Sequence, residues 1–109
     1  MKRGDLYTAA VRGVYRGKPR PAVIVQDDRF DATESVTVCP LTTVPIDASF
    51  ARIDIEPSAF NGLDRLSWLM VDKVFTIPRA GLRDHVGALS SSDIVRLDRA
   101  LLVFLGLAD

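Results

Sequence analysis

The sequence predicts a mainly β fold with helices, in which short strands form a small, partly open barrel that ends in a C-terminal helix. Short apolar segments, some alternating with polar residues, are separated by glycine, proline and asparagine over residues 6–77. From Asp93 onwards, apolar residues recur at the three- to four-residue spacing of an α-helix. Many short strands followed by one amphipathic helix favour a barrel with the helix at its edge.

Six segments have the composition of strands. Residues 6–11 begin the series, and a loop rich in glycine follows. The continuous apolar run 21–26 is typical of a central strand that is buried on both faces. Residues 36–41 are β-rich, with Pro40 marking the point where regular hydrogen bonding is interrupted. Residues 52–56 alternate strictly, and 67–71 and 74–77 are two further short extended segments beyond an Asn61–Gly62 turn.

The C-terminal helix has recognisable ends. Serines at 90–92 are candidate N-caps, and Gly106 is a plausible stop. We expect the apolar stripe to face the core; its members are Ile94, Leu97, Leu101, Phe104 and Leu105.

Composition favours one soluble domain over residues 1–109. The apolar fraction is 48% and the charged fraction 26%, as in globular proteins, and this length can bury a self-sufficient core. No apolar run approaches the about 20 residues of a membrane span. The residues after Met1 lack the apolar stretch of a secretory signal. We therefore expect a cytoplasmic protein that does not contact a membrane.

The charge distribution is uneven although the net charge is zero. Seven of the fourteen basic residues lie within the first 29 positions, against three acids there. This local basic character suits a polyanion, and it equally suits an ordinary solvated face. Cys39 is the single cysteine, and we interpret it as a small core residue. Because no His/Cys/carboxylate cluster has metal-ligand spacing, we expect no metal and no cofactor.

Five blocks in order, each weak alone, make the chain similar to the MazF/PemK/Kid-like toxins of type II toxin–antitoxin systems, a family of growth-inhibiting endoribonucleases. The resemblance implies an SH3-like β-barrel, the MazF/CcdB-like toxin fold, with a C-terminal amphipathic helix. The blocks are residues 3–7 (Arg-Gly-Asp-Leu-Tyr), 19–25 (Pro-Arg-Pro-Ala-Val-Ile-Val), 38–43 (Val-Cys-Pro-Leu-Thr-Thr), 69–77 (with Asp72 and Lys73) and 86–90, which lead into the closing helix.

The resemblance also implies a function. Family members cleave single-stranded RNA sequence-specifically and without metal, by attack of the ribose 2′-hydroxyl on the adjacent phosphate. We therefore expect such an endoribonuclease, inhibited by a MazE-like antitoxin through an acidic, disordered C-terminal segment. We also expect a homodimer, to which Trp68, Leu69 and the closing helix contribute contacts.

The resemblance assigns catalysis to Arg20 and Thr42, and more weakly to Asp72. Arg20 lies between two prolines that restrict its backbone, so its guanidinium could be preorganised to bind phosphate oxygens. Asp72 matches a catalytic aspartate of Kid-type members, but the arginine found two positions earlier there is Met70 here. A structural role for Asp72 therefore stays open. Residues 12–18 also lack the carboxylate that many relatives have, which leaves the proton acceptor unassigned.

Candidate RNA-binding residues include basic and aromatic side chains in the loop before Arg20, where a tyrosine could stack on an unpaired base. Solvated loop residues are an equally good interpretation. We expect the lone histidine, His85, not to be catalytic, and Trp68 to be a packing residue rather than a stacking platform. The RNA-binding candidates are Tyr15, Arg16, Lys18, Pro40, Thr43 and Lys73.

Two alternatives use the same barrel. A CcdB-like toxin inhibits DNA gyrase without cutting nucleic acid, but its Trp-Gly-Ile ending is absent from residues 104–109. A catalytically inactive barrel that only binds a partner is the second alternative, and the missing loop carboxylate keeps it open.

Overall fold

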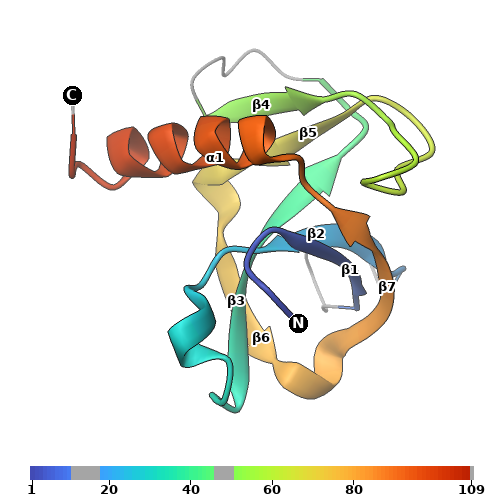
Figure 1. The fold of residues 1–109 in the computed structure, drawn as a ribbon, viewed down its shortest axis with the longest axis vertical. Helices are drawn as coiled ribbons and strands as arrows, with labels where there is room; N and C mark the ends of the chain where they lie inside the picture. Colours follow the sequence, from blue (N-terminus) through green and yellow to red (C-terminus); the bar gives the residue numbers. More distant parts are fainter. Residues whose placement is uncertain (11–17, 46–50, 109) are drawn as a thin grey trace.

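The computed structural model describes residues 1–10, 18–45 and 51–108, and it consists of a strongly curved antiparallel sheet with one α-helix packed against it (Figure 1). This confirms the predicted fold class, and the predicted strands recur with ends shifted by a residue or two. The strands are β1 (Asp5–Ala9), β2 (Arg20–Ile24), β3 (Ser35–Thr42), β4 (Arg52–Ile55), β5 (Ser67–Met70), β6 (Phe75–Pro78) and β7 (Leu82–Ala88); the helix is α1 (Ser91–Phe104); and the 3-10 turns are η1 (Asp28–Phe30), η2 (Val71–Lys73) and η3 (Arg79–Gly81).

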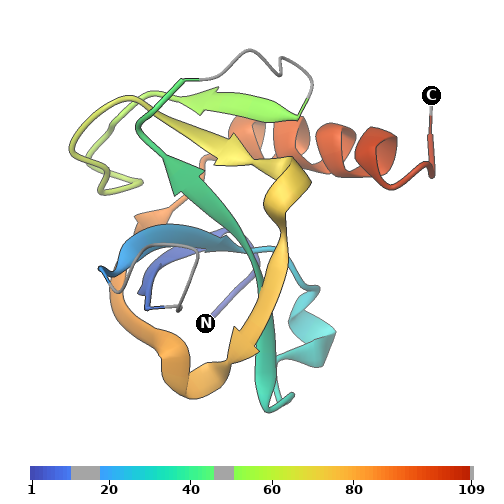
Figure 2. The same ribbon diagram turned by 180° about the vertical axis from the view of Figure 1, so that it is seen from behind.

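The longest strand, β3, connects the two parts of the sheet. The strand order is β4-β5-β3-β2-β1-β7, and β6 pairs with the first half of β3. Residues Val38 to Pro40 pair with β2, whereas Leu41 and Thr42 pair with β5. Pro40, which has no N–H to donate, therefore lies where β3 passes from one set of partners to the other. Seen from behind, β3 runs across the molecule from β6 to β5 (Figure 2).

The core consists of two apolar clusters on opposite faces of the central strands. Val23 and Cys39 belong to the cluster under α1, whereas their neighbours Ala22, Ile24 and Val38 belong to the other. Both faces of β2 are thus buried, which explains its continuous apolar run and confirms the prediction of a central strand. Cys39 is fully buried, as predicted.

Helix α1 begins and ends as the sequence indicates. The Ser90 hydroxyl accepts a hydrogen bond from the Asp93 amide at 3.2 Å, and Gly106 ends the helix with a φ of +75°. The first turns pack on the sheet, with Leu97 fully buried. The last turn extends beyond the sheet (Figure 1), so the predicted core role of the stripe is wrong for Phe104 and Leu105, which are 45% and 61% exposed.

Strand β7 has no counterpart among the predicted strands. Arg83, Asp84 and His85 of this strand are all exposed, and among the described strands it pairs with β1 alone, at the edge of the sheet. An edge strand with little buried surface needs no apolar alternation, so the pattern that identifies strands is missing. In the described part of the chain, no helix is long and apolar enough to cross a membrane.

Candidate functional site

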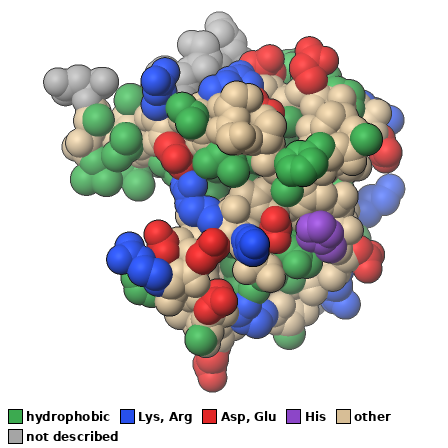
Figure 3. Space-filling view, in the orientation of Figure 1, with side chains coloured by type: hydrophobic (Ala, Val, Ile, Leu, Met, Phe, Trp, Pro, Cys, Tyr) green, Lys and Arg blue, Asp and Glu red, His purple; other side chains and the backbone are tan. Residues whose placement is uncertain are grey.

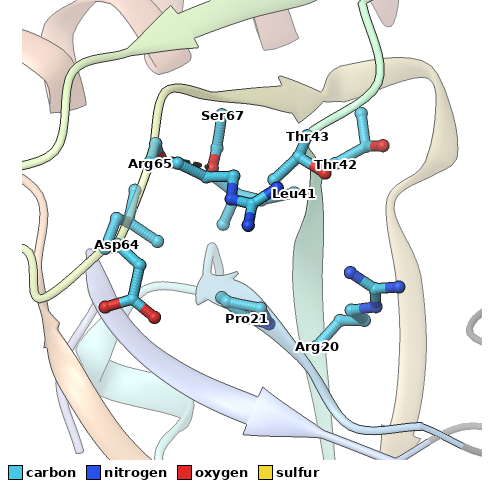
Figure 4. Close-up of a pocket in the computed structure, with 9 residues that line it drawn as sticks. Arg20, Pro21, Leu41, Thr42, Thr43, Asp64, Arg65 and Ser67 are labelled. Atoms are coloured by element: carbon cyan, nitrogen blue, oxygen red, sulfur yellow. Dashed lines mark hydrogen bonds between the residues drawn. The ribbon is translucent and has the colours of Figure 1, made fainter.

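A pocket of about 280 Å³ opens where β2 begins, β3 ends and the loop before β5 passes close to both (Figure 4). It brings together three of the residues that the sequence predicts for the site, Arg20, Thr42 and Thr43. The other residues that line it are Pro21, Leu41, Leu63, Asp64, Arg65 and Ser67.

Arg20 is the first residue of β2 and pairs with Ala9 across the sheet. The pyrrolidine ring of Pro21 fixes the backbone that follows, and the exposed Arg20 side chain extends towards the end of β3 (Figure 4). Within the described residues, its guanidinium forms neither an ion pair nor a side-chain hydrogen bond. All five of its N–H donors can therefore serve a ligand.

Thr42 is the last residue of β3, and its backbone is held opposite Trp68 of β5. Its Oγ1 accepts a hydrogen bond from the amide of Val44 at 3.1 Å. Because that bond uses a lone pair of the oxygen, the hydroxyl proton remains available for donation to a ligand. Thr43 lines the same wall and adds a second hydroxyl.

The pocket therefore combines an unpaired guanidinium with neutral hydroxyl donors at its rim. Both groups suit an anion whose charge is spread over several oxygens, such as a phosphate. No group of three or more His, Cys, Asp or Glu side chains that could hold a metal ion occurs among residues 1–10, 18–45 and 51–108. The chemistry that these residues can supply is anion binding and hydrogen-bond donation.

The chain is similar in sequence to proteins of known families. Residues 2–105 match the family described as PemK-like, MazF-like toxin of type II toxin-antitoxin system. The chain belongs to this toxin family. It is 62% identical, over 99% of both chains, to the probable endoribonuclease MazF of Mycolicibacterium smegmatis. We therefore describe it as a MazF-like endoribonuclease toxin, which favours RNA cleavage over the gyrase-inhibitor alternative.

Solved structures agree with this fold. The Mycobacterium tuberculosis toxin MazF-mt6 superimposes with a TM-score of 0.80 at 25% identity, over 96% of this chain and 98% of its own. A mycobacterial endoribonuclease in complex with its cognate antitoxin gives a TM-score of 0.83 at 23% identity, over 100% of this chain and 98% of its own. The mainly antiparallel sheet with one C-terminal helix is thus the MazF-like fold.

In this toxin, Asp72 is not among the described residues that line the pocket. It lies in η2 and forms a bidentate ion pair with Arg52 of β4. Arg52 Nε donates to Asp72 Oδ1 at 3.0 Å and Nη2 donates to Oδ2 at 3.3 Å. The Arg52 side chain is only 5% exposed, and Asp72 is 29% exposed. Met70 faces Arg52 in the register of β4 and β5, so a neighbouring strand supplies the arginine that the sequence comparison found missing.

The remaining predicted RNA-binding residues lie apart from the pocket or outside the described residues. Tyr15 and Arg16 fall within 11–17 and are outside them. Lys18 is exposed just before β2, and Lys73 is exposed in η2; neither is among the described residues that line the pocket. Pro40 is fully buried, so its side chain has no surface to offer to RNA, and its prediction as an RNA-binding residue is wrong.

Two aromatic predictions can also be placed. His85 lies on β7, exposed and in edge contact with the ring of Tyr7 at 5.1 Å between centroids, and it does not line the pocket. Trp68 is half-buried in β5. The prediction did not include the wall formed by Leu63, Asp64 and Arg65. The only local signal for it is a pair of charged residues, Asp64 and Arg65, that follows Leu63 after the Asn61–Gly62 turn.

Cys39 is close to the Arg52–Asp72 ion pair but is chemically inert. Burial raises the pKa of its thiol to about 12, and the nearby Asp72 carboxylate adds to that rise. Because the thiolate is the nucleophilic form, a thiol held protonated throughout the physiological range does not act as a nucleophile.

Proposed function

We propose that this toxin cleaves single-stranded RNA without a metal, by attack of a ribose 2′-hydroxyl on the adjacent phosphate in the pocket between β2 and β3. The observation that supports this most directly is the convergence of Arg20, Thr42 and Thr43 on one pocket, with Arg20 unpaired among the described residues. A cytoplasmic location, where RNA is available, is part of the same proposal.

Arg20 and Thr42 each have a defined role in this reaction. The bond from the 2′ oxygen to phosphorus forms while the bond from phosphorus to the 5′ oxygen breaks, so one proton leaves the 2′ oxygen and one reaches the 5′ oxygen. Negative charge accumulates on the non-bridging phosphate oxygens during this step. Arg20 holds those oxygens through paired N–H donors, and Thr42 donates its hydroxyl proton to one of them.

The toxin should cleave RNA at the same rate with and without excess EDTA. The reason is that the proposed charge stabilisation comes from a guanidinium and a hydroxyl rather than from a bound cation. The measurement uses purified toxin, a mixed RNA pool and mapping of the new ends. We expect 2′,3′-cyclic phosphates on one side of each cut and 5′-hydroxyls on the other. Loss of cleavage in EDTA that Mg²⁺ restores, or 5′-phosphate ends, would show that another mechanism operates.

We also propose that the toxin is a homodimer in solution. The last turn of α1 and the residues after it expose a continuous apolar surface, visible at the projecting end of the helix in Figure 3. Such a surface usually marks an interface. Leu69, which the sequence assigned to this contact, is fully buried in the core, so that part of the prediction is wrong. The exposed residues are Leu102, Val103, Phe104, Leu105 and Leu107.

Light scattering at micromolar concentration should therefore give about twice the chain mass of 12.0 kDa. Replacing Phe104 and Leu105 by serine should shift the protein towards the monomer, because both side chains are exposed and contribute little to the fold of one chain. A wild-type monomer at these concentrations would refute the proposed dimer.

An antitoxin should inhibit the toxin by occupying the RNA site with an acidic segment, because a pocket arranged for phosphates also attracts carboxylates. A mycobacterial endoribonuclease of this fold forms a complex with its cognate antitoxin, which supports an antitoxin as the partner proposed here. We expect antitoxin and RNA to compete, and inhibition to weaken as salt is raised. A tight antitoxin complex that still cleaves RNA at the uninhibited rate would contradict occlusion of the site.

A further inference from the structure

The loop between β4 and β5 supplies one wall of the pocket. Leu63, Asp64 and Arg65 line the pocket from this loop. Asp64 and Arg65 lie across the pocket from the end of β3 (Figure 4). Figure 4 shows the Arg65 guanidinium extending into the space between Thr43 and Pro21, whereas the Asp64 carboxylate is turned away from it and from Arg20.

The loop is anchored by Asn61, whose side chain is almost completely buried at 4% exposure. Its Oδ1 accepts hydrogen bonds from the amides of Ser58 and Leu63, both at 3.0 Å, and its Nδ2 donates to the carbonyl of Glu56 at 2.8 Å. One side chain thereby ties together both ends of the turn that precedes Arg65. Buried, hydrogen-bonded polar groups of this kind fix a loop in one conformation.

Close packing against β7 also holds this turn in place. Gly62 has a φ of +73°, and a Cβ there would lie 2.1 Å from the carbonyl oxygen of Val86. A Cβ on Gly87 would lie 2.4 Å from the backbone of Asn61. Only glycine fits at either position, so the two backbones lie directly on each other. Arg65 therefore projects from a rigid support, and the Ser67 hydroxyl also holds its carbonyl oxygen at 3.0 Å.

Two guanidinium groups thus line one pocket, and among the described residues the Asp64 carboxylate, which also lines it, forms an ion pair with neither of them. The ion pairs found in the described part of the chain use other arginines, namely Arg3, Arg29, Arg52 and Arg96. Two exposed guanidinium groups along one pocket give it a positive charge that attracts a polyanion. The successive phosphates of an RNA strand suit such an arrangement, because each phosphate can accept hydrogen bonds from a planar fork.

We propose that Arg65 is a second phosphate-binding residue, which holds the RNA backbone from the wall opposite Arg20. Arg20 and Thr42 act on the phosphate that is cleaved, and Arg65 contributes mainly to binding the strand before and during the reaction. This inference rests on the proposed RNA site, and it adds a contact that contributes to affinity more than to the chemical step.

The test separates binding from chemistry. The wild-type cleavage site is mapped first, and an RNA oligonucleotide containing it is made with a 2′-O-methyl group at the attacking position, which prevents cleavage. Binding of this probe is measured over a series of salt concentrations for wild type and for Arg65→Ala, Arg65→Lys and Arg29→Ala. Arg29→Ala is the matched control, because this variant also removes one positive charge, but from a residue in η1 that does not line the pocket. The Arg29 side chain is 82% exposed.

We expect Arg65→Ala to weaken binding of the probe about tenfold and to reduce the slope of log affinity against log salt by about 0.7, the loss of one phosphate contact on a single strand. Arg65→Lys should restore the slope, because it restores the charge, while recovering only part of the affinity. With the natural RNA, KM should rise about tenfold for Arg65→Ala, while kcat changes less than threefold. Arg29→Ala should match wild type in all three measurements.

Three outcomes would overturn the proposal. Arg65→Ala could bind with the wild-type salt slope, or it could lose kcat with unchanged affinity for the probe, or Arg29→Ala could show the same losses. Thermal unfolding of each variant distinguishes loss of a contact from loss of the fold. Wild-type protein that neither binds the probe nor cleaves RNA would instead refute the proposed RNA site and this inference with it, whereas failure at Arg65 alone leaves the proposed function intact.

Discussion

Replacing Arg20 by alanine should lower the rate of RNA cleavage on the order of 10²–10³-fold, the usual loss for one preorganised donor to a developing anion. Thr42→Ala should produce a loss of similar order, because it removes the hydroxyl that lines the same pocket. Both side chains lie at the pocket rim, outside the two core clusters, so the fold should survive. Single-turnover kinetics at saturating toxin measure the effect on the chemical step alone.

The lysine variant shows whether charge or geometry matters. Arg20→Lys keeps the positive charge but loses the paired donors, so it should recover only part of the rate. Circular dichroism and thermal unfolding of each variant establish that the folded state is compared. If folded Arg20→Ala cleaved RNA as fast as wild type, Arg20 would have no part in the reaction, even though the chain belongs to the toxin family.

Asp72→Ala should reduce the free energy of unfolding by about 3 kcal/mol, because it leaves the guanidinium of Arg52 buried without its partner. Arg52 is 5% exposed and donates two of its N–H groups to Asp72. The expected loss is at the lower end of the usual range, since Asp72 itself is 29% exposed. For a domain of this size it corresponds to a fall in Tm of roughly 10 °C. Urea unfolding followed by Trp68 fluorescence gives the free energy directly.

A double variant distinguishes a broken ion pair from a general loss of packing. Replacing both partners, Arg52→Met with Asp72→Leu, removes the unpaired charge and should recover part of the stability that Asp72→Ala loses. If Asp72 is structural, cleavage per folded molecule should change by less than about tenfold. If an Asp72 variant were as stable as wild type but cleaved RNA a hundredfold more slowly, Asp72 would have to be considered a catalytic residue.

Local patterns along the chain were sufficient to predict most of the elements. The apolar run at β2, the alternation in β4 and the helical spacing in α1 each reflect which faces of one element are buried, and that information is contained in neighbouring residues. The caps of α1 are equally local, because Ser90 bonds to an amide three residues away. Edge strand β7 was not predicted, because few of its side chains are buried and its sequence therefore lacks the apolar alternation of a half-buried strand.

The candidate site was predictable only in part, through two short motifs. Arg20 and Thr42 could be named because each stands in a block that resembles the family. Nothing in the sequence between them, residues 21–41, shows that their side chains line the same pocket. That depends on the pairing of β2 with β3, which brings Ala22 opposite Pro40. The wall with Arg65 lies more than twenty residues further along the chain, and its position depends on the packing of Gly62 against Val86.

The sequence by itself thus determined the fold class, the position of the central strands and helix, and three of the pocket residues, because short-range periodicity and local motifs encode them. Only the tertiary structure decided that Arg52 of β4 is the partner of Asp72, that Pro40 and Leu69 are buried, and that the end of α1 is exposed. The physical reason is register: which side chains meet is set by pairing between strands far apart in sequence, and a shift of one residue would reverse every face.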